Sequence, residues 1–170
     1  MLIRRENPED YETVYSVIKE AFAHAEHADG NEPDLVNSLR VGSAFISELS
    51  LIAEIDGRIA GHILFTKAKV GDNTVLALAP LSVLPEYQRQ GVGTALIREG
   101  HRIARELGYR YSVVLGSAAY YPKEGYLPAA TFGITPSFDV PLENFMAYKL
   151  DEEAPDIYGV MKYAGEFGIV

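Results

Sequence analysis

The spacing of hydrophobic side chains predicts a strand and two helices in the first forty residues. Residues 1–5 predict a short strand. Asn7 and Pro8 are typical of a helix start, because Asn can cap the first turn and Pro is tolerated at its first position. Apolar side chains then recur at helical spacing at Val14, Val17, Ile18, Ala21 and Phe22. A second helix is expected over residues 33–41, ended by Gly42.

Longer apolar runs in the middle of the chain predict strands. Residues 51–55 and 58–70 flank Asp56 and Gly57, a pair that favours a two-residue hairpin turn. Residues 74–83 predict a further strand, which is expected to be covered on both faces because few of its side chains are polar. The three strands would form a meander.

The second half of the chain predicts one long helix between strands. Residues 93–107 carry apolar side chains at helical spacing, and Gly108 ends the segment. Strands are expected over residues 110–115 and 145–150, while the tail from Asp151 shows no clear pattern. Mostly antiparallel strands joined to a crossover helix predict an α/β (α+β) fold, with a central mixed, mostly antiparallel sheet flanked by helices.

Composition narrows the class of protein. A length of 170 residues with 48% hydrophobic and 23% charged residues predicts one globular domain over residues 1–170. The absence of cysteine excludes disulfides, thiolate metal ligands and a cysteine nucleophile. No run approaches the ~18 apolar residues of a membrane span, so we expect a soluble, cytoplasmic protein without a membrane partner. The net charge of −9 argues against nucleic acid as the main partner, and it suits a cationic amine or serves only solubility.

The loop before the long helix has the residues of a phosphate-binding turn. Gly91 and Gly93 let a backbone approach a ligand closely, and the first amides of a helix bind anions. Arg89 can add a charge-assisted contact. Glycines here can also serve only the turn, so spacing alone leaves both interpretations open. Leu96 stands where a dinucleotide fingerprint needs a third glycine, and the Walker Gly-Lys-Ser/Thr is missing, which disfavours a nucleotide-dependent oxidoreductase and a kinase.

Two segments resemble a known family. Residues 83–96, with Gln88-Arg89-Gln90-Gly91-Val92-Gly93 at their centre, resemble the acetyl-CoA motif Arg/Gln-x-x-Gly-x-Gly/Ala of the GCN5-related N-acetyltransferase (GNAT) superfamily. Residues 121–126 resemble its Tyr-x-x-x-Gly-Phe segment, with Tyr126 in place of the usual Phe. Residues 79–83 and 115–121 are similar to the YhbS-like bacterial members.

The resemblance implies a GNAT fold and direct transfer of an acetyl group from acetyl-CoA, as cosubstrate, to an amine of a small molecule or a protein. It also implies an oxyanion donor and a pantetheine-binding edge at the end of the fourth strand. The cofactor-binding residues that it implies are Leu81, Ser82, Val83, Gln88, Arg89, Gln90, Gly91, Val92, Gly93, Thr94, Gly116 and Tyr120.

The resemblance suggests a residue for the general acid of this reaction but none for the general base. Tyr121 matches the family's general acid, although it can instead be only a wall of the acyl pocket, and Tyr120 is its rival. Many relatives carry a basic Glu near the fourth strand, but residues 74–84 contain no acidic side chain. Glu54 and His62 could act through water, while an exposed or structural role is the simpler interpretation of each.

Two other features of the sequence contain histidine. His24 and His27, with Glu20 and Glu26, could contribute to a metal site, but no third group of ligands is evident, so no metal is expected. His101 follows the helical periodicity and is expected at the surface or in packing.

The acceptor and the assembly are the least constrained features. Residues 23–32 and 126–144 are expected to form the walls of the acceptor pocket. Asp29, Glu32 and Asp139 could attract a cationic amine there or only solubilise the surface. The resemblance to the family is the only basis for expecting a homodimer. The competing function is a CoA-binding sensor or structural module without turnover.

Overall fold

The computed structural model describes residues 1–25 and 28–169. In these ranges a nine-stranded sheet runs in the order β1-β2-β3-β4-β5-β8-β6, and β9 pairs with both β3 and β7. The pairs β4–β5 and β7–β9 are parallel and the others are antiparallel. The strands are β1 Leu2–Arg5, β2 Phe45–Ile55, β3 Arg58–Val70, β4 Asn73–Val83, β5 Tyr111–Leu115, β6 Leu127–Pro128, β7 Ile134–Thr135, β8 Phe145–Lys149 and β9 Gly159–Lys162.

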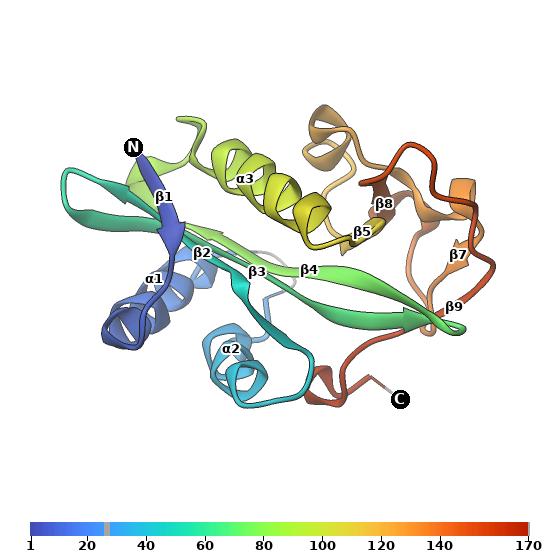
Figure 1. The fold of residues 1–170 in the computed structure, drawn as a ribbon. Helices are drawn as coiled ribbons and strands as arrows, with labels where there is room; N and C mark the ends of the chain where they lie inside the picture. The colour runs from blue at the N-terminus through green and yellow to red at the C-terminus, as the bar shows by residue number, and fades with distance from the viewer. Residues whose placement is uncertain (26–27, 170) are drawn as a thin grey trace.

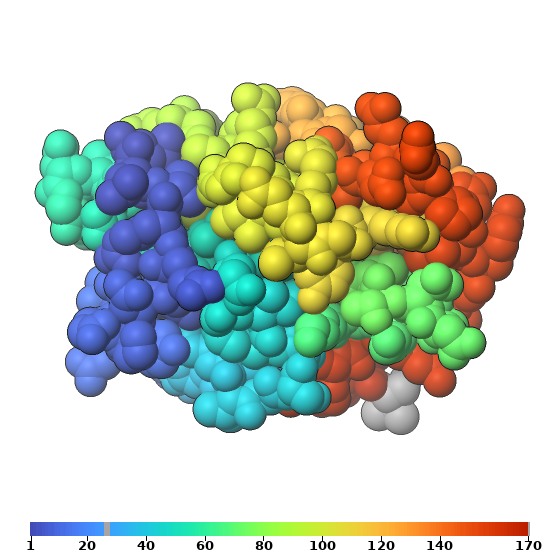
Figure 2. All heavy atoms as spheres, in the orientation of Figure 1, coloured from blue at the N-terminus to red at the C-terminus, as the bar shows by residue number. Residues whose placement is uncertain are grey.

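Three α-helices of the described ranges cover the two faces of this sheet. Helices α1 (Tyr11–Phe22) and α2 (Glu32–Arg40) lie on one face, and α3 (Val92–Glu106) lies on the other (Figure 1). In the space-filling view α3, in yellow, separates the blue N-terminal residues from the red C-terminal segment (Figure 2). Short 3-10 turns connect the elements: Pro8–Asp10, Pro85–Tyr87, Tyr121–Glu124, Ala129–Phe132, Leu142–Asn144 and Gly165–Phe167.

The two faces of β3 build separate parts of the core. Ile63 and Phe65 belong to the cluster beneath α3, while Leu64 packs with the residues of α1 and α2. This alternation follows from the two-residue period of a strand. Since helices cover both faces, the middle of the sheet is buried on both sides, as the apolar runs predict.

The predicted fold class is confirmed, and several element boundaries differ from those expected. The strand expected from residue 51 begins at Phe45. The hydrophobic pattern did not indicate this earlier start, because the polar residues Ser47 and Glu48 interrupt the apolar run. The first α-helix begins at Tyr11 after a 3-10 turn, where the Asp10 carboxylate accepts the Asn7 amide at 2.7 Å. The tail without a clear pattern contributes β9 and a last 3-10 turn.

β4 leaves its neighbour β5 part-way along its length. The two strands pair only at Leu76 with Ser112 and at Ala77 with Val113. Just beyond, the register between β3 and β4 shifts by one residue, from Phe65 opposite Leu78 to Ile63 opposite residue 81. Such a bulge bends a strand and increases its twist. Residues 78–83 therefore keep β3 on one side and have no described strand paired on the other.

None of the helices in the described ranges combines the length and the hydrophobicity needed to cross a membrane.

The packing of α3 on the sheet gives a stability test. Gly100 is buried in α3, and a Cβ there would lie 2.7 Å from Cζ of the buried Phe65 ring. Gly→Ala in a helix ordinarily stabilises by up to ~1 kcal/mol. Here we expect Gly100→Ala to destabilise by about 1–3 kcal/mol, because overpacking outweighs helix propensity. Urea unfolding measures the difference, with Gly165→Ala as the control because nothing lies within 4 Å of its Cβ position. Equal stability of the two variants would contradict the expected clash.

Candidate functional site

The loop between β4 and α3 is held in shape by its own side chains. The Gln88 amide donates to the Val83 carbonyl at 3.1 Å, and the Gln90 amide donates to the Glu86 carbonyl at 2.9 Å. Arg89 and Gly91 both adopt positive φ, at 62° and 84°. Residues 88–91 are exposed, so the loop presents a fixed backbone to solvent.

The helix that follows begins with free amides. Gly91 caps α3, and the first α-helical hydrogen bond of α3 joins the Ala95 amide to the Gly91 carbonyl at 3.0 Å. The amides of residues 92–94 therefore precede the ladder and carry the positive end of the helix dipole. Nothing lies within 4 Å of the Cβ position at Gly91, so an anion has room to approach this turn.

Gly93 also lies where a tyrosine side chain approaches the start of the helix. A Cβ at Gly93 would collide with the Tyr120 hydroxyl, and Leu81 Cδ2 lies 3.7 Å from the same position. A side chain at position 93 would force the Tyr120 hydroxyl to shift, so glycine lets this tyrosine pack against the helix start. The contact also brings β4, the first turn of α3 and the connection after β5 together.

A carboxylate that sequence analysis did not select joins the same region. The Thr94 hydroxyl donates to Glu124 Oε1 at 2.6 Å, and the Glu124 side chain is only 7% exposed. Arg98 Nε lies 3.8 Å from Glu124 Oε2. A cavity of about 160 Å³ adjoins this contact, lined by Arg98, His101, Arg105, Lys123, Glu124 and Tyr148. A Glu inside the Tyr-x-x-x-Gly segment was the available clue, but its partner in α3 is 30 residues away and could not be identified by spacing.

Tyr121 lies in an aromatic corner. Its ring meets the rings of Tyr120 and Tyr126 edge-on, with centroids 5.1 and 5.6 Å away. A Cβ at Gly116 would collide with the Tyr121 ring, so Gly116 makes room for this tyrosine. Burial raises the pKa of the Tyr121 hydroxyl above its ordinary value. The hydroxyl makes no hydrogen bond to the described residues, and it is protonated at neutral pH.

The end of β4 lies beside these groups. Leu81 and Val83 are half-buried and pack against the same cluster as Tyr120 and Tyr121. Ser82 points to the opposite face, where it is 1% exposed. The structure thus brings together the three regions predicted to bind the cofactor: residues 81–83, the turn at the start of α3, and the Gly116–Tyr121 connection.

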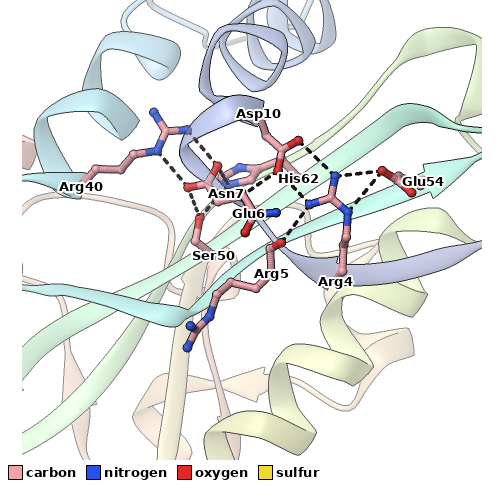
Figure 3. A network of polar contacts seen from close by, with 9 residues as sticks. All are labelled: Arg4, Arg5, Glu6, Asn7, Asp10, Arg40, Ser50, Glu54 and His62. Atoms are coloured by element: carbon pink, nitrogen blue, oxygen red, sulfur yellow. Dashed lines mark hydrogen bonds and ion pairs between the residues drawn. The ribbon is translucent and has the colours of Figure 1, made fainter.

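The two base candidates are occupied elsewhere. Glu54 forms an ion pair with Arg4 at 2.8 Å, and Arg4 also binds Asp10 at 2.8 Å. His62 is 0% exposed and lies among Glu6, Arg40 and Ser50 on the α1/α2 face, opposite α3 (Figure 3).

The group around His62 is a buried polar network. Arg40 donates to both carboxylate oxygens of Glu6, at 2.8 and 3.0 Å, and the Ser50 hydroxyl donates to Glu6 Oε1 at 2.6 Å. Ser50 Oγ lies 3.0 Å from His62 Nε2. Burial lowers the pKa of His62 to about 4, so the imidazole is neutral at physiological pH. Burial alone would raise the pKa of Glu6, but its hydrogen bonds with Arg40 and Ser50 help to hold that pKa below its ordinary value.

Of the two places expected for His101, the surface or the packed interior, the structure shows the interior. His101 is 4% exposed, stacks on Tyr148 with centroids 4.2 Å apart, and shares a hydrogen bond of 2.9 Å with the Tyr126 hydroxyl. Ser112 Oγ lies 2.8 Å from the same hydroxyl. A tyrosine at position 126 therefore gains two polar partners that a phenylalanine could not use.

The suggested acceptor and metal residues take local roles where they are described. Asp29 accepts the Asn31 amide at 2.8 Å and Glu32 accepts the Asp29 amide at 3.2 Å, while Asp139 is exposed. Glu26 and His27 lie outside the described residues. Within the described ranges no group of three or more His, Asp or Glu side chains is placed to hold a metal ion.

The chain is similar to known proteins over most of its length. The model of the acetyltransferase (GNAT) family matches residues 11–126. The uncharacterized N-acetyltransferase YhbS of Escherichia coli K12 is 29% identical over 171 residues, covering 98% of both chains. YjhQ of the same organism, also an uncharacterized N-acetyltransferase, is 45% identical over 103 residues, which span 58% of this chain and 57% of YjhQ.

Two solved structures are similar in fold as well as in sequence. YhbS from Escherichia coli in complex with CoA superposes with a TM-score of 0.89 at 27% identity, covering 98% of this chain and 91% of YhbS. A GNAT family acetyltransferase from Brucella melitensis in complex with acetyl-CoA gives 0.81 at 32% identity, covering 98% and 97%.

The buried network gives a second stability test. The side chains of Arg40 and Glu6 are 5% and 2% exposed, whereas those of the Arg5–Glu48 pair are 51% and 44% exposed. We expect Arg40→Met to destabilise by about 3–5 kcal/mol at neutral pH, because it leaves the Glu6 carboxylate buried without its cation. Arg5→Met should cost no more than ~1 kcal/mol. Urea unfolding of the two variants measures both, and similar small losses would show that the Glu6–Arg40 pair is not what stabilises this face.

Proposed function

The chain belongs to the acetyltransferase (GNAT) family, and from this premise we propose that it transfers an acetyl group from acetyl-CoA to a primary amine of a small molecule or protein. The enzyme class, an acetyl-CoA-dependent N-acetyltransferase, follows from the family and from the relatives of that class. The observation that carries the proposal is the meeting of three groups: the free amides at the start of α3, the unpaired edge of β4, and Tyr121.

In this proposal the cofactor lies along the edge that β5 leaves open. The backbone of residues 88–94 and the positive end of α3 bind the pyrophosphate. Residues 81–83 pair with the pantetheine amides as an added strand does, and one of their amides donates to the oxyanion. Gly116 and Tyr120 line the same channel. The three cations Arg98, Arg105 and Lys123 near the cavity favour the approach of a polyphosphate.

The reaction forms one bond and breaks another at the thioester carbon. The neutral amine attacks the carbonyl, the oxyanion forms beside residues 81–83, and the C–S bond then breaks with its electron pair going to sulfur. Tyr121 donates its hydroxyl proton to the leaving thiolate, and the nitrogen releases its proton to solvent. The Tyr121 phenolate then regains a proton from solvent before the next turnover. The Tyr121 hydroxyl is protonated at neutral pH, as a general acid must be before it acts, although the burial that raises its pKa also makes the proton harder to release.

One observation favours the competing function, a CoA-binding module without turnover. Residues 74–84 contain no acidic side chain, and both Glu54 and His62 are engaged by other groups. Binding of acetyl-CoA without release of CoA, across a broad panel of amines, would favour this alternative.

The cofactor site is tested by thermal shift with acetyl-CoA, CoA, NAD and ATP. At 100 times Kd, acetyl-CoA should stabilise the native chain by about 2.7 kcal/mol. We expect Gly91→Val to abolish this stabilisation, because a branched side chain would fill the space that a phosphate needs. Gly57→Val is the control: its φ of 77° is similar to the 84° of Gly91, nothing lies within 4 Å of its Cβ position, and it lies in the β2–β3 turn. An unchanged acetyl-CoA shift in folded Gly91→Val protein would refute the phosphate site.

The general acid is tested by removing one hydroxyl. We expect Tyr121→Phe to lower kcat by roughly 100-fold or more, with little change in acetyl-CoA affinity, because the leaving thiolate loses its proton donor. Thiol release measures turnover, and a chain without cysteine contributes no thiol background. Tyr120→Phe tests the rival tyrosine in the same assay, and a larger loss of kcat there than in Tyr121→Phe would assign the proton donor to Tyr120 instead. An unchanged kcat in Tyr121→Phe protein, when chemistry limits the rate, would leave Tyr121 only a wall of the pocket.

A further inference from the structure

Two buried polar atoms on neighbouring strands lack partners on the α1/α2 face. Within the described ranges, His62 Nδ1 and Ser82 Oγ make no hydrogen bond, although the two residues are only 0% and 1% exposed. His62 on β3 stands directly opposite Ser82 on β4. Buried polar atoms cost free energy unless they are hydrogen-bonded, so two of them opposite one another require an explanation.

The network on the other side of His62 fixes its tautomer. The Ser50 hydroxyl donates its proton to Glu6 Oε1, so Ser50 Oγ can only accept from the imidazole. The proton of the neutral ring is therefore on Nε2, and Nδ1 carries a lone pair. His62 is thus an acceptor toward any donor that lies between β3 and β4.

We propose that one buried water bridges His62 Nδ1 and Ser82 Oγ, and that His62 is thereby a positioning residue for the acyl-transfer strand. Side chains directly opposite one another on antiparallel strands have Cβ atoms ~4.5–5.5 Å apart, so His62 Nδ1 and Ser82 Oγ belong to neighbouring side chains that nevertheless make no direct hydrogen bond. Buried waters occur about once per 27 residues and satisfy polar groups of this kind. The water donates to His62 Nδ1 and accepts from the Ser82 hydroxyl.

The bridge completes a polar chain across the sheet. It runs from Arg40 on α2 through Glu6, Ser50 and His62 to Ser82 on β4 (Figure 3 shows its first four members). Residues 78–83 do not pair with β5, so β3 is the only described strand beside them. An anchor at Ser82 would fix the backbone that, under the proposed function on which this inference rests, supplies the oxyanion donor. Such a donor must lie within ~2.7–3.1 Å of the oxyanion to be effective.

The positioning role is tested with three single variants and one double variant. Ser82→Ala removes one end of the bridge, and His62→Gln keeps a donor toward Ser50 while it loses the Nδ1 acceptor. We expect each to lower kcat roughly tenfold, less than the ~100- to 1,000-fold cost of deleting an oxyanion donor, with unchanged acetyl-CoA affinity. The double variant should lose no more than either single one, because both break the same bridge. CoA release is measured with the best amine of a panel or, failing that, with water as acceptor.

Thr66→Val is the matched control. Thr66 Oγ1 is also buried on this face of β3 without a described partner, but the residue opposite is Ala77, which has no polar side chain. Turnover of Thr66→Val should equal that of the wild type. Additive losses in the double variant, a loss in Thr66→Val equal to that in Ser82→Ala, or full kcat in folded Ser82→Ala would each overturn the positioning role.

The bridging water is tested in the protein without substrate, so the result of this test does not depend on catalytic activity. A high-resolution crystal structure should show one water within hydrogen-bond distance of both atoms, and ¹⁵N NMR should show the His62 proton on Nε2. The absence of a water between His62 Nδ1 and Ser82 Oγ, or a His62 proton on Nδ1, would refute the proposed bridge. Absence of any acetyl-CoA stabilisation in the wild type would instead overturn the proposed function and leave the bridge result standing.

Discussion

The site depends on the early separation of β4 from β5. The two strands share only two residue pairs, after which a one-residue bulge against β3 turns β4 away from its neighbour. A strand that diverges in this way has unpaired backbone groups on one edge, and those groups need a partner. In this family fold the partner that we propose is the cofactor. The same separation makes β3 the support on which the position of residues 81–83 depends.

On the α3 face, glycines give tyrosines and a phenylalanine room to approach the backbone. Tyr120 packs on Gly93, Tyr121 packs on Gly116, and a core phenylalanine packs on Gly100 in the middle of α3. These contacts pack the connection after β5 against the start of the helix. The free amides of α3 and the aromatic corner are consequently held as one unit, which favours a preorganised site.

The opposite face combines a polar network with an apolar core. A neutral His62, a charged Glu6–Arg40 pair and Ser50 lie under α1 and α2 with little access to solvent. A histidine in this setting is a poor proton acceptor, since burial holds its pKa near 4. In the tautomer that we infer, Nδ1 is a hydrogen-bond acceptor, which suits positioning better than base catalysis.

The sequence alone determined the fold class, the turn at Gly91 and the region of Tyr121, because local periodicity, turn chemistry and a motif are all short-range properties. It also indicated the strands on which the proposed site is built. The tertiary structure alone decided that Tyr120 packs on Gly93, that Glu124 accepts from Thr94, and that His62 is buried in a network with Glu6. These contacts join residues that are 27 to 56 positions apart in the printed sequence, and no local pattern encodes them, because which side chains meet across a sheet depends on strand order and register.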